Sequence, residues 1–551
     1  YYRFFIYLRS HFLKRLFSNL HLCVTHTCII NKILAFTMRL KIKKTGSFKQ
    51  SKKYIDLINQ ATVYDTAIKT PITFAKNISK KLANDVFLKR EDLQPVFSFK
   101  NRGAYNKISQ LSASQKKLGV IAASAGNHAQ GVANASQKLK IPCLIVMPET
   151  TPEIKIQSVQ SFGSKILLHG DNYNQAYKKA SQIAKDKGME LIPAFDDPLT
   201  IAGQGTIGKE IESEEEAFDA VFIPVGGGGL LAGVSAWIAQ HSPKTKVYGV
   251  EVEDSACLLE AVKFNKRVKL REVGLFADGV AVEQIGKHTF DVIKECVDGV
   301  ITVSIDEVCA AVKDIFEDTR VLSEPAGALA LAGLKKYCKK INNKKLIAIS
   351  SGANINFERL SYIVERSEVG EDREKLLSIK IPEKPGSFLK LCRIFGKSQI
   401  TEFNYRFSDQ AEAHVLVGIR LKNDNAFKTL RAKLKKSRFS YSDLTRSVIS
   451  NDHLRHMIGG HLIKANNLNE RLFRCKFPVK PGALLDFLKA FGSERNISLF
   501  HYRNLGAAFA NVLIGIQEET GKQKSLIKHL QSLDYEFIEE SDNVGYINFL
   551  K

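Results

Sequence analysis

Residues 220–230 read AVFIPVGGGGL, an apolar run that ends directly in four glycines. A continuous apolar run, rather than an alternating one, predicts a strand buried on both faces, as in a parallel sheet covered by helices. Similar runs recur between longer amphipathic segments, at 118–123, 143–147, 165–168, 247–250 and 346–349. The pattern predicts a doubly wound α/β domain, in which ligands bind at the carboxyl ends of the strands.

The four glycines at 226–229 are suited to holding an anion. They let the backbone wrap closely around a ligand, and a helix expected from Leu230 would present its positive end there. A phosphate group is the natural guest. The stretch GQGTIGK at 203–209 has the spacing of an ATP-binding loop. Glu210 follows it in place of Ser or Thr and no strand precedes it, so an ATPase is not expected.

Two further loops contain candidate functional residues. In SFKNRGA at 98–104, Lys100 follows Phe99 and does not belong to a charge run. A lysine desolvated among apolar neighbours has a lowered pKa and becomes an amine nucleophile, although a lone lysine is more often a solvated surface residue. In SAGNHAQG at 124–131, the start of an Ala-rich helix and the Asn127 amide can bind ligand oxygen atoms. His128 by itself is more often structural.

After Glu371 the sequence contains an internal repeat. IPEKPGSF at 381–388 recurs 96 residues later as FPVKPGAL, NYR at 404–406 matches HYR at 501–503, and HVLVGI at 414–419 matches NVLIGI at 511–516. Each copy predicts the order strand, helix, strand, strand, helix, strand, which is the split βαβ arrangement. We therefore expect a basic leader, one large domain and two small ferredoxin-like α+β modules, at 1–53, 54–372, 373–450 and 470–551.

Composition excludes several classes of protein. The 551 residues include 81 Lys+Arg and 57 Asp+Glu, but residues 1–55 alone hold 12 of the basic residues and no acidic one. The remainder is only mildly basic, so the net charge is no evidence for a nucleic-acid partner.

The sequence contains no run of about 20 apolar residues, so no membrane-spanning helix is expected. Nine scattered cysteines without a CxxC pair indicate reduced thiols, and no metal site is expected at His453 and His456, which lack a companion ligand.

The leader has two interpretations. The sequence begins with Tyr1, and its first methionine is Met38. An acid-free, basic leader can be an organellar transit peptide. Alternatively, residues 1–37 lie upstream of the true start at Met38 and are absent from the mature protein, and this second interpretation is preferred. We expect a cytoplasmic protein, or an organellar one if the leader is a transit peptide.

The three loops resemble those of the fold-type II pyridoxal-phosphate enzymes, and among these the threonine dehydratases. FADGVAV at 276–282, SEPAGA at 323–328 and SGANIN at 351–356 continue the resemblance in the same order. The repeat is similar to the paired ACT-like regulatory modules of the biosynthetic members, so the resemblance covers nearly everything after Tyr54. Asn101 stands where Leu is common in the family, and Asp278 where Glu is frequent, but neither change removes a chemical role.

The resemblance implies a role for each loop. Lys100, beside Phe99, would bind pyridoxal 5'-phosphate as a Schiff base and act as the catalytic base. Asn127 would bond the ring hydroxyl, and Ser351 would face the ring nitrogen. A neutral hydroxyl cannot keep that nitrogen protonated as a carboxylate can, which suits β-elimination. The phosphate would lie against Gly226, Gly227, Gly228, Gly229 and Leu230, and the substrate carboxylate against Ser124, Ala125, Gly126 and Asn127.

The implied reaction is the deamination of L-threonine to 2-oxobutanoate and ammonia, the first committed step of isoleucine biosynthesis, with L-serine as a secondary substrate. The resemblance further implies a homotetramer. Isoleucine would inhibit this enzyme, and valine would oppose the inhibition. Tyr405 and Tyr502, at matching places in the repeat, are candidates for effector sites, unless they are packed core aromatics. The alternatives are serine dehydratase, serine racemase or threonine synthase activity on the same scaffold, and an inactive amino-acid sensor. The double module and the intact loops count against them.

Overall fold

The computed structural model describes residues 39–42, 48–214, 217–339, 341–370, 374–406, 412–421, 424–445, 447, 468–478, 483–491, 496–503, 509–519, 527 and 537–543. The leader up to residue 38 and the pair His453 and His456 lie outside these ranges. The chain divides into two compact units, Tyr1–Ser367 and Glu368–Lys551, and we describe each by itself.

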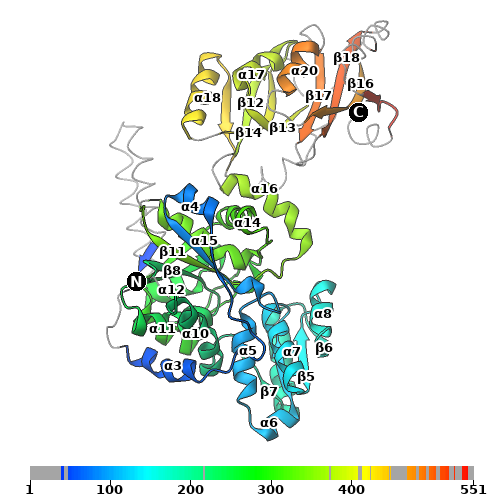
Figure 1. Ribbon diagram of the computed structural model, residues 1–551. Coiled ribbons are helices and arrows are strands. Elements are labelled where there is room, and N and C mark those ends of the chain that lie inside the picture. The colour runs from blue at the N-terminus through cyan, green and yellow to red at the C-terminus, as the bar shows by residue number, and fades with distance from the viewer. Residues whose placement is uncertain are drawn as a thin grey trace, which may run out of the picture. The chain divides into compact units, whose positions relative to one another are not determined.

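The described residues of the N-terminal unit form two sheets (Figure 1). The large sheet consists, in spatial order, of β1 (Arg39–Lys41), β10 (Gly299–Val303), β9 (Lys246–Val252), β8 (Ala220–Pro224), β11 (Lys345–Ser350), β3 (Asp85–Arg90) and β2 (Ile72–Phe74). Its five inner strands are parallel, and the two edge strands are antiparallel to their neighbours. The small parallel sheet consists of β6 (Lys165–Leu168), β5 (Cys143–Met147), β4 (Val120–Ala123) and β7 (Glu190–Leu191).

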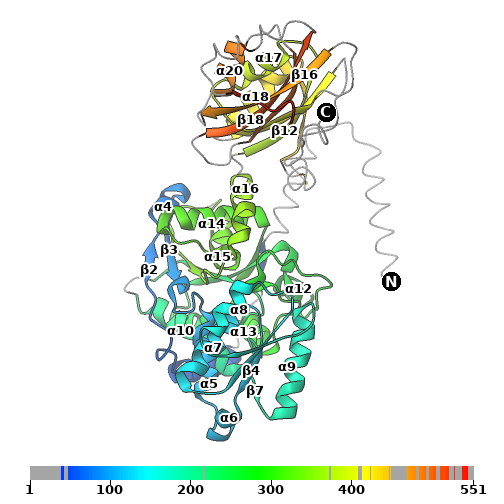
Figure 2. The same ribbon diagram turned by 90° about the vertical axis from the view of Figure 1, so that its right-hand side faces the viewer.

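Helices cover the sheets of this unit (Figure 2). They are α3 (Lys49–Asn59), α4 (Lys76–Leu82), α5 (Lys100–Ser109), α6 (Ala113–Leu118), α7 (Asn127–Leu139), α8 (Glu153–Gln160), α9 (Tyr173–Lys187), α10 (Pro198–Glu212), α11 (Gly229–His241), α12 (Cys257–Phe264), α13 (Lys287–Cys296), α14 (Ile305–Thr319), α15 (Pro325–Cys338) and α16 (Leu360–Gly370). Four single turns of 3₁₀-helix are η1 (Glu91–Leu93), η2 (Glu253–Ser255), η3 (Asp278–Val280) and η4 (Phe357–Arg359).

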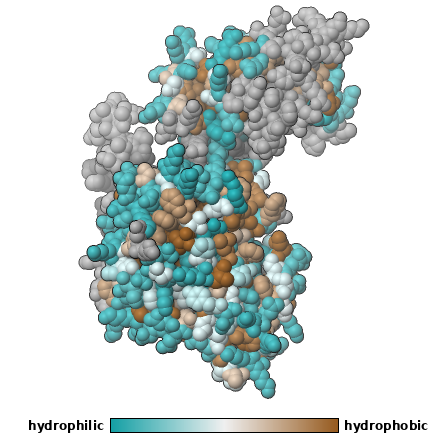
Figure 3. Space-filling view, in the orientation of Figure 1, coloured by the Kyte–Doolittle hydropathy of each residue, from teal (hydrophilic) through white to brown (hydrophobic). Residues whose placement is uncertain are grey.

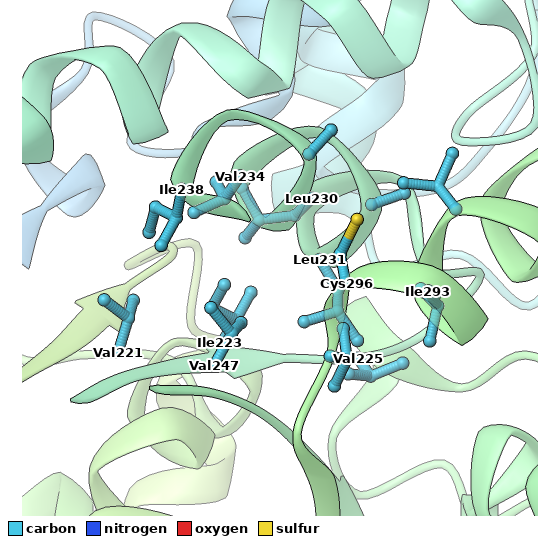
Figure 4. Packing of buried hydrophobic residues seen from close by; sticks show 14 of the residues in the cluster. Val221, Ile223, Val225, Leu230, Leu231, Val234, Ile238, Val247, Ile293 and Cys296 are labelled. Carbon is cyan, nitrogen blue, oxygen red and sulfur yellow. The ribbon is translucent and has the colours of Figure 1, made fainter. Parts of the chain in front are cut away.

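The apolar run that ends in four glycines is buried on both faces, as predicted. Val221 and Ile223 of β8 belong to one apolar cluster, and Phe222 belongs to the cluster on the opposite face. Figure 4 shows side chains of β8 and of the following helix α11, among them Val234 and Ile238, pointing toward one another. This packing fixes α11 against the sheet, so the glycine loop that joins β8 to α11 is held at both ends.

The stretch with ATP-loop spacing lies inside helix α10 and forms no loop. A Cβ atom on Gly203 would lie 2.7 Å from the Cα atom of Gly103 in α5, so the two helices pack with their backbones in contact. Glu210 is a buried ion-pair partner of Lys89 and Arg102. These glycines therefore serve helix packing and not nucleotide binding.

Two elements before or across residue 54 also pack in the N-terminal unit. β1 pairs with β10, and α3 contributes Tyr54 and Ile58 to the core of the same unit. The short basic segment around β1 has no apolar run, so its pairing at a sheet edge left no signal in the sequence. The division of the strands into two sheets was not predicted, because strand runs alone do not show which strands pair.

The C-terminal unit contains one eight-stranded antiparallel sheet. In spatial order its strands are β15 (Ser440–Asp443), β12 (Glu374–Pro382), β14 (Glu412–Arg420), β13 (Gln399–Arg406), β17 (Asn496–Arg503), β18 (Phe509–Glu519), β16 (Leu468–Pro478) and β19 (Phe537–Glu539). Its described helices are α17 (Ser387–Phe395), α18 (Asp424–Lys436) and α20 (Ala483–Phe491). The first repeat follows the predicted βαββαβ order.

The two repeats join edge to edge through β13 and β17. Asn404 of the first repeat pairs with His501, its counterpart in the second. On either side, Tyr405 lies opposite Phe500, and Phe403 lies opposite Tyr502. The repeat therefore has a pseudo-twofold axis at the Asn404–His501 pair, and both tyrosines flank it.

Within the described residues, no helix has the length and apolar character needed to cross a membrane. Figure 3 shows hydrophilic side chains over most of the coloured face of the N-terminal unit, with apolar side chains in smaller patches.

Candidate active site

The predicted site residues lie just beyond the carboxyl ends of parallel strands. Asn127 is the first residue of α7, which follows β4, and Gly229 is the first residue of α11, which follows β8. Ser351 follows β11 directly. Lys100 is the first residue of α5. β4 belongs to the small sheet, and β8 and β11 belong to the large one. Open α/β sheets bind ligands at the carboxyl ends of their strands, so each sheet presents its loops at its ligand-binding end.

Lys100 lies in surroundings that favour its neutral form. Its Nζ atom donates a hydrogen bond to the carbonyl oxygen of Ala194 (3.1 Å) and lies 5.3 Å from the centre of the Phe99 ring. Burial lowers the pKa of Lys100 to about 8, although the negative charge of Glu324 acts in the opposite direction. A lysine with this pKa supplies a reactive amine near neutral pH.

Asn127 is held by two hydrogen bonds. Its Nδ2 atom donates to Oε1 of Glu324 (2.6 Å), and its Oδ1 atom accepts from Nδ2 of Asn354 (2.7 Å). Neither Glu324 nor Asn354 was assigned a role from the sequence, although both lie in runs that carry the resemblance. Charged side chains are seldom buried, and nothing in the local sequence shows that Glu324 is only 3% exposed.

The glycine loop is formed as a cradle. Gly228 has φ of +89°, a conformation that residues with a Cβ atom rarely adopt. A Cβ atom on Gly227 would lie 2.2 Å from the Phe195 ring. Thr289 Oγ1 donates a hydrogen bond to the Gly227 carbonyl (2.8 Å) and fixes the orientation of that peptide group. The first N–H groups of α11, including that of Leu230, have no partners within the helix and can bind an anion.

Ser351 lies in a turn that joins several loops. Its Oγ atom donates to the Ala326 carbonyl (3.3 Å). Its own carbonyl accepts from the backbone N–H of Phe99 (3.2 Å), one residue before Lys100. The neighbouring Gly352 carbonyl accepts from the N–H of Glu324 (3.2 Å). The turn therefore brings Ser351 into the same structure as Lys100 and Glu324.

Residues 192–197 connect the remaining loops, and sequence reasoning missed them. The Ile192 carbonyl accepts from His128 Nε2 (2.9 Å), the Ala194 carbonyl holds Lys100, and Phe195 packs on the glycine loop. Burial, followed by the charge of Lys100, lowers the pKa of His128 to about 4, so its ring is neutral and its role is structural, the commoner role for such a histidine. The contacts of this segment with His128 and Lys100 use backbone carbonyls, which leave no signature in side-chain type.

Residues 124–126 are less buried than their surroundings and precede α7. The N–H of Gly126 donates to Ser124 Oγ (3.3 Å). The first N–H groups of α7 have no partners within the helix, so this end of the helix carries a partial positive charge. It can bind a carboxylate.

Tyr405 and Tyr502 are both buried members of the C-terminal core. Tyr405 Oη donates to Glu383 Oε2 (2.5 Å), and its ring packs edge-on against Phe388 at 4.7 Å between centres. Glu383 and Phe388 also line a surface pocket that residues of both repeats share.

A desolvated lysine, a phosphate cradle, an amide and a hydroxyl on this fold define a pyridoxal-phosphate enzyme of fold-type II. Residues 63–352 match the family model for pyridoxal-phosphate dependent enzymes, and residues 365–454 and 461–550 each match the model for the C-terminal regulatory domain of threonine dehydratase. The residues fit the cofactor, since burial favours the amine form of Lys100 and, within the described residues, the backbone N–H groups of Gly227 and Gly228 donate to no other group.

Named relatives specify the family further. The chain is 45% identical to the biosynthetic L-threonine dehydratase of Burkholderia multivorans, over 91% of this chain and 99% of the relative. It is 44% identical to the chloroplastic biosynthetic threonine dehydratase of Arabidopsis thaliana, over 91% and 84%. The processed threonine deaminase isoform 2 of Solanum lycopersicum superposes with a TM-score of 0.59 at 45% identity, covering 60% and 96%. This chain belongs to the biosynthetic L-threonine dehydratase family.

Proposed function

We propose that this chain deaminates L-threonine to 2-oxobutanoate and ammonia, as the first committed step of isoleucine biosynthesis, and accepts L-serine as a secondary substrate. The observation that carries the proposal is that Lys100, Asn127, the glycine loop and Ser351 are linked by contacts through residues 192–197 and Glu324, next to strand ends of both sheets. Identity of 45% to a biosynthetic L-threonine dehydratase along nearly the whole chain supports the choice of substrate.

Each loop has one task in the proposed reaction. The helix α11 and the glycine loop bind the cofactor phosphate, Asn127 its ring oxygen and Ser351 its ring nitrogen. When bound, pyridoxal phosphate supplies an electron sink for the charge that develops on the substrate α-carbon. Lys100 Nζ removes the α proton as general base. The Ala194 carbonyl can then accept a hydrogen bond from the resulting ammonium group.

The loop of Ser124, Ala125, Gly126 and Asn127 binds the substrate carboxylate. Its location at the positive end of α7 supports this assignment. A carboxylate bound there is oriented by backbone N–H groups, which do not change charge with pH. Recognition of the carboxylate is then separate from the proton transfer at Lys100.

Keto-acid formation by the purified enzyme tests the proposal directly. L-Threonine should yield 2-oxobutanoate faster than L-serine yields pyruvate, and isoleucine should slow both. Formation of D-serine without keto acid would favour the serine racemase alternative. Absence of turnover by the cofactor-loaded enzyme would favour the inactive sensor.

The pH dependence of cofactor attachment tests the environment of Lys100. Only the neutral amine attacks the cofactor aldehyde. With a pKa of about 8, the neutral fraction rises roughly fivefold from pH 7 to pH 8 and is nearly complete above about pH 9. Stopped-flow absorbance of cofactor-depleted protein mixed with pyridoxal phosphate should show this plateau. A rate that still rises tenfold per pH unit at pH 9.5 would indicate a solvated lysine instead.

The surface pocket of the C-terminal unit is the proposed effector site, where isoleucine inhibits and valine opposes it. It combines the Pro-Gly turn of the first repeat with Leu488, Asn496 and Ile497 of the second. Tyr405 contacts two residues of its lining, since it donates to Glu383 and packs on Phe388. Tyr502 occupies the matching position on β17 in the second repeat.

Replacing Tyr405 by phenylalanine should weaken isoleucine inhibition and leave the uninhibited rate unchanged. The variant keeps the ring packing but loses the hydrogen bond to Glu383, which is worth about 1 kcal/mol, or roughly fivefold in half-inhibitory concentration. Tyr441→Phe is the control, since that hydroxyl bonds Arg431 outside the pocket. Equal inhibition of all three proteins would exclude this pocket as the effector site.

Assembly and location follow from the same proposal. The enzyme is a homotetramer in the cytoplasm, or in an organelle if the basic leader is a transit peptide. Light scattering of the purified protein tests the assembly, and mass spectrometry of the native N-terminus tests the leader.

A further inference from the structure

A chain of hydrogen bonds runs from Val96 to Glu324 through the two amides of the site. Asn354 Nδ2 donates to the Val96 carbonyl (2.9 Å) and to Asn127 Oδ1 (2.7 Å). Asn127 Nδ2 in turn donates to Glu324 Oε1 (2.6 Å). Every amide in the chain therefore has a defined orientation.

The direction of this chain follows from its two ends. A backbone carbonyl only accepts, so Val96 requires the nitrogen of Asn354 to face it. Asn354 then donates to Asn127, which leaves the Asn127 nitrogen facing Glu324. An amide nitrogen has two hydrogens. Glu324 takes one of them, and the second has no hydrogen-bond partner within the part of the chain that the structure describes.

Glu324 is not used as an ordinary helix cap. It occupies the N-cap position of α15, where a side-chain oxygen commonly accepts from the first N–H groups of the helix. Its side chain makes no such bond and turns to Asn127 instead. The carboxyl is closely enclosed, because a Cβ atom on Gly352 would lie 2.3 Å from Oε1.

We propose that Glu324 is a positioning residue that, with Asn354 at the other end, orients the Asn127 amide so that its second N–H points to the ring oxygen of the cofactor. The inference rests on the proposed assignment of Asn127 to that oxygen. Without Glu324, Asn127 loses its acceptor and can turn. A glutamine at 324 retains an oxygen that can accept from Asn127 but cannot ionise.

The charge of Glu324 should also be visible in the bound cofactor. Burial, with a smaller contribution from Asp278, raises the pKa of Glu324 to about 7, while the Asn127 N–H, Lys155 and Lys100 act to lower it. The charged groups that face the carboxyl are Asp278, Lys155 and Lys100. Between pH 6 and 8 it gains negative charge, which strengthens its bond to Asn127 and should change the absorbance of the cofactor.

The test measures cofactor affinity by equilibrium dialysis and the bound-cofactor spectrum from pH 6 to 9 in full-length protein. Glu324→Leu and Asn127→Ala should each weaken affinity about tenfold, the loss of one hydrogen bond. Glu324→Gln should stay within about threefold of the parent yet lose the spectral change near pH 7. Glu295→Gln is the control, since that buried carboxylate accepts from the N–H groups of Gln50 and Ser51 at the start of α3.

Two outcomes would overturn the inference. Unchanged affinity in Glu324→Leu, with weakened affinity in Asn127→Ala, would show that Asn127 needs no positioning. A Glu324→Gln variant as weak as Glu324→Leu would show that charge and not orientation matters. Unchanged affinity in Asn127→Ala would instead contradict the assignment of Asn127 in the proposed function. If Glu324→Leu does not fold, the cofactor affinity of Glu324→Gln and its absorbance from pH 6 to 9 test the inference instead.

Discussion

Replacing Lys100 by alanine is expected to abolish the visible absorption of the lysine-bound cofactor and to lower turnover by at least about 10³-fold. The substitution removes the amine that the structure places beside Ala194 and Phe99. It removes both the covalent attachment and the base for the α proton. The loss should therefore appear in kcat as well as in the spectrum.

Two controls separate chemistry from folding. Lys138→Ala removes an exposed lysine from α7 and should leave both readouts unchanged. Addition of a small primary amine to Lys100→Ala should restore part of the activity, because the glycine loop and Ser351 are still in place. A Lys100→Ala enzyme that keeps the absorption band and turns over normally would refute the assignment of Lys100.

The parts of the site that could be predicted from the sequence are those marked by a local pattern of residue types. An apolar strand followed by glycines, a lysine outside a charge run and a small-residue helix start each have a local physical signature, and the structure places all three at the carboxyl ends of strands. Buried strands were predictable for the same reason, since short continuous apolar runs between amphipathic segments are typical of strands covered on both faces.

The remaining features depend on contacts between distant segments. Glu324 and Asn127 are 197 residues apart, and the bond between them has no local signature. The backbone carbonyls of Ile192 and Ala194 act regardless of side chain. The pairing of β13 with β17 joins the edge strands of the two repeats, and the sequence of a strand does not show which other strand it pairs with. In each case the three-dimensional arrangement, and not the residue type, determines the role.

A buried network of charged residues includes Arg102, which follows Lys100 by two residues. Arg102 is fully buried, and its guanidinium donates to both carboxylate oxygens of Glu91 (2.8 Å each) and to both of Glu210 (2.5 and 3.0 Å). Lys89 Nζ donates to Glu210 Oε2 (2.6 Å) and to the Thr70 carbonyl (2.6 Å). The network joins β3, α5 and α10, and Arg102 is only two residues beyond Lys100 in the first turn of α5.

Replacing Arg102 by methionine should lower the free energy of unfolding of the N-terminal unit by about 3–5 kcal/mol. The cost arises because Glu91 and Glu210 keep their buried negative charges without the cation that compensates them. The protein has one tryptophan, Trp237 in α11, so its fluorescence during urea denaturation reports this unit alone. Lys263→Met, which breaks a pair with Glu260 exposed by 43% and 30%, should cost less than about 1 kcal/mol.

The same variant should also lose activity while it is still folded. Because Arg102 anchors the first turn of α5, its loss frees the segment that fixes Lys100 Nζ near Ala194, and kcat should fall while the pocket of the C-terminal unit still responds to isoleucine. Equal unfolding free energies for Arg102→Met and Lys263→Met would show that the network is not a source of stability. A destabilised variant with full kcat would show that Lys100 is positioned by its contacts with residues 192–197 and not by the network behind it.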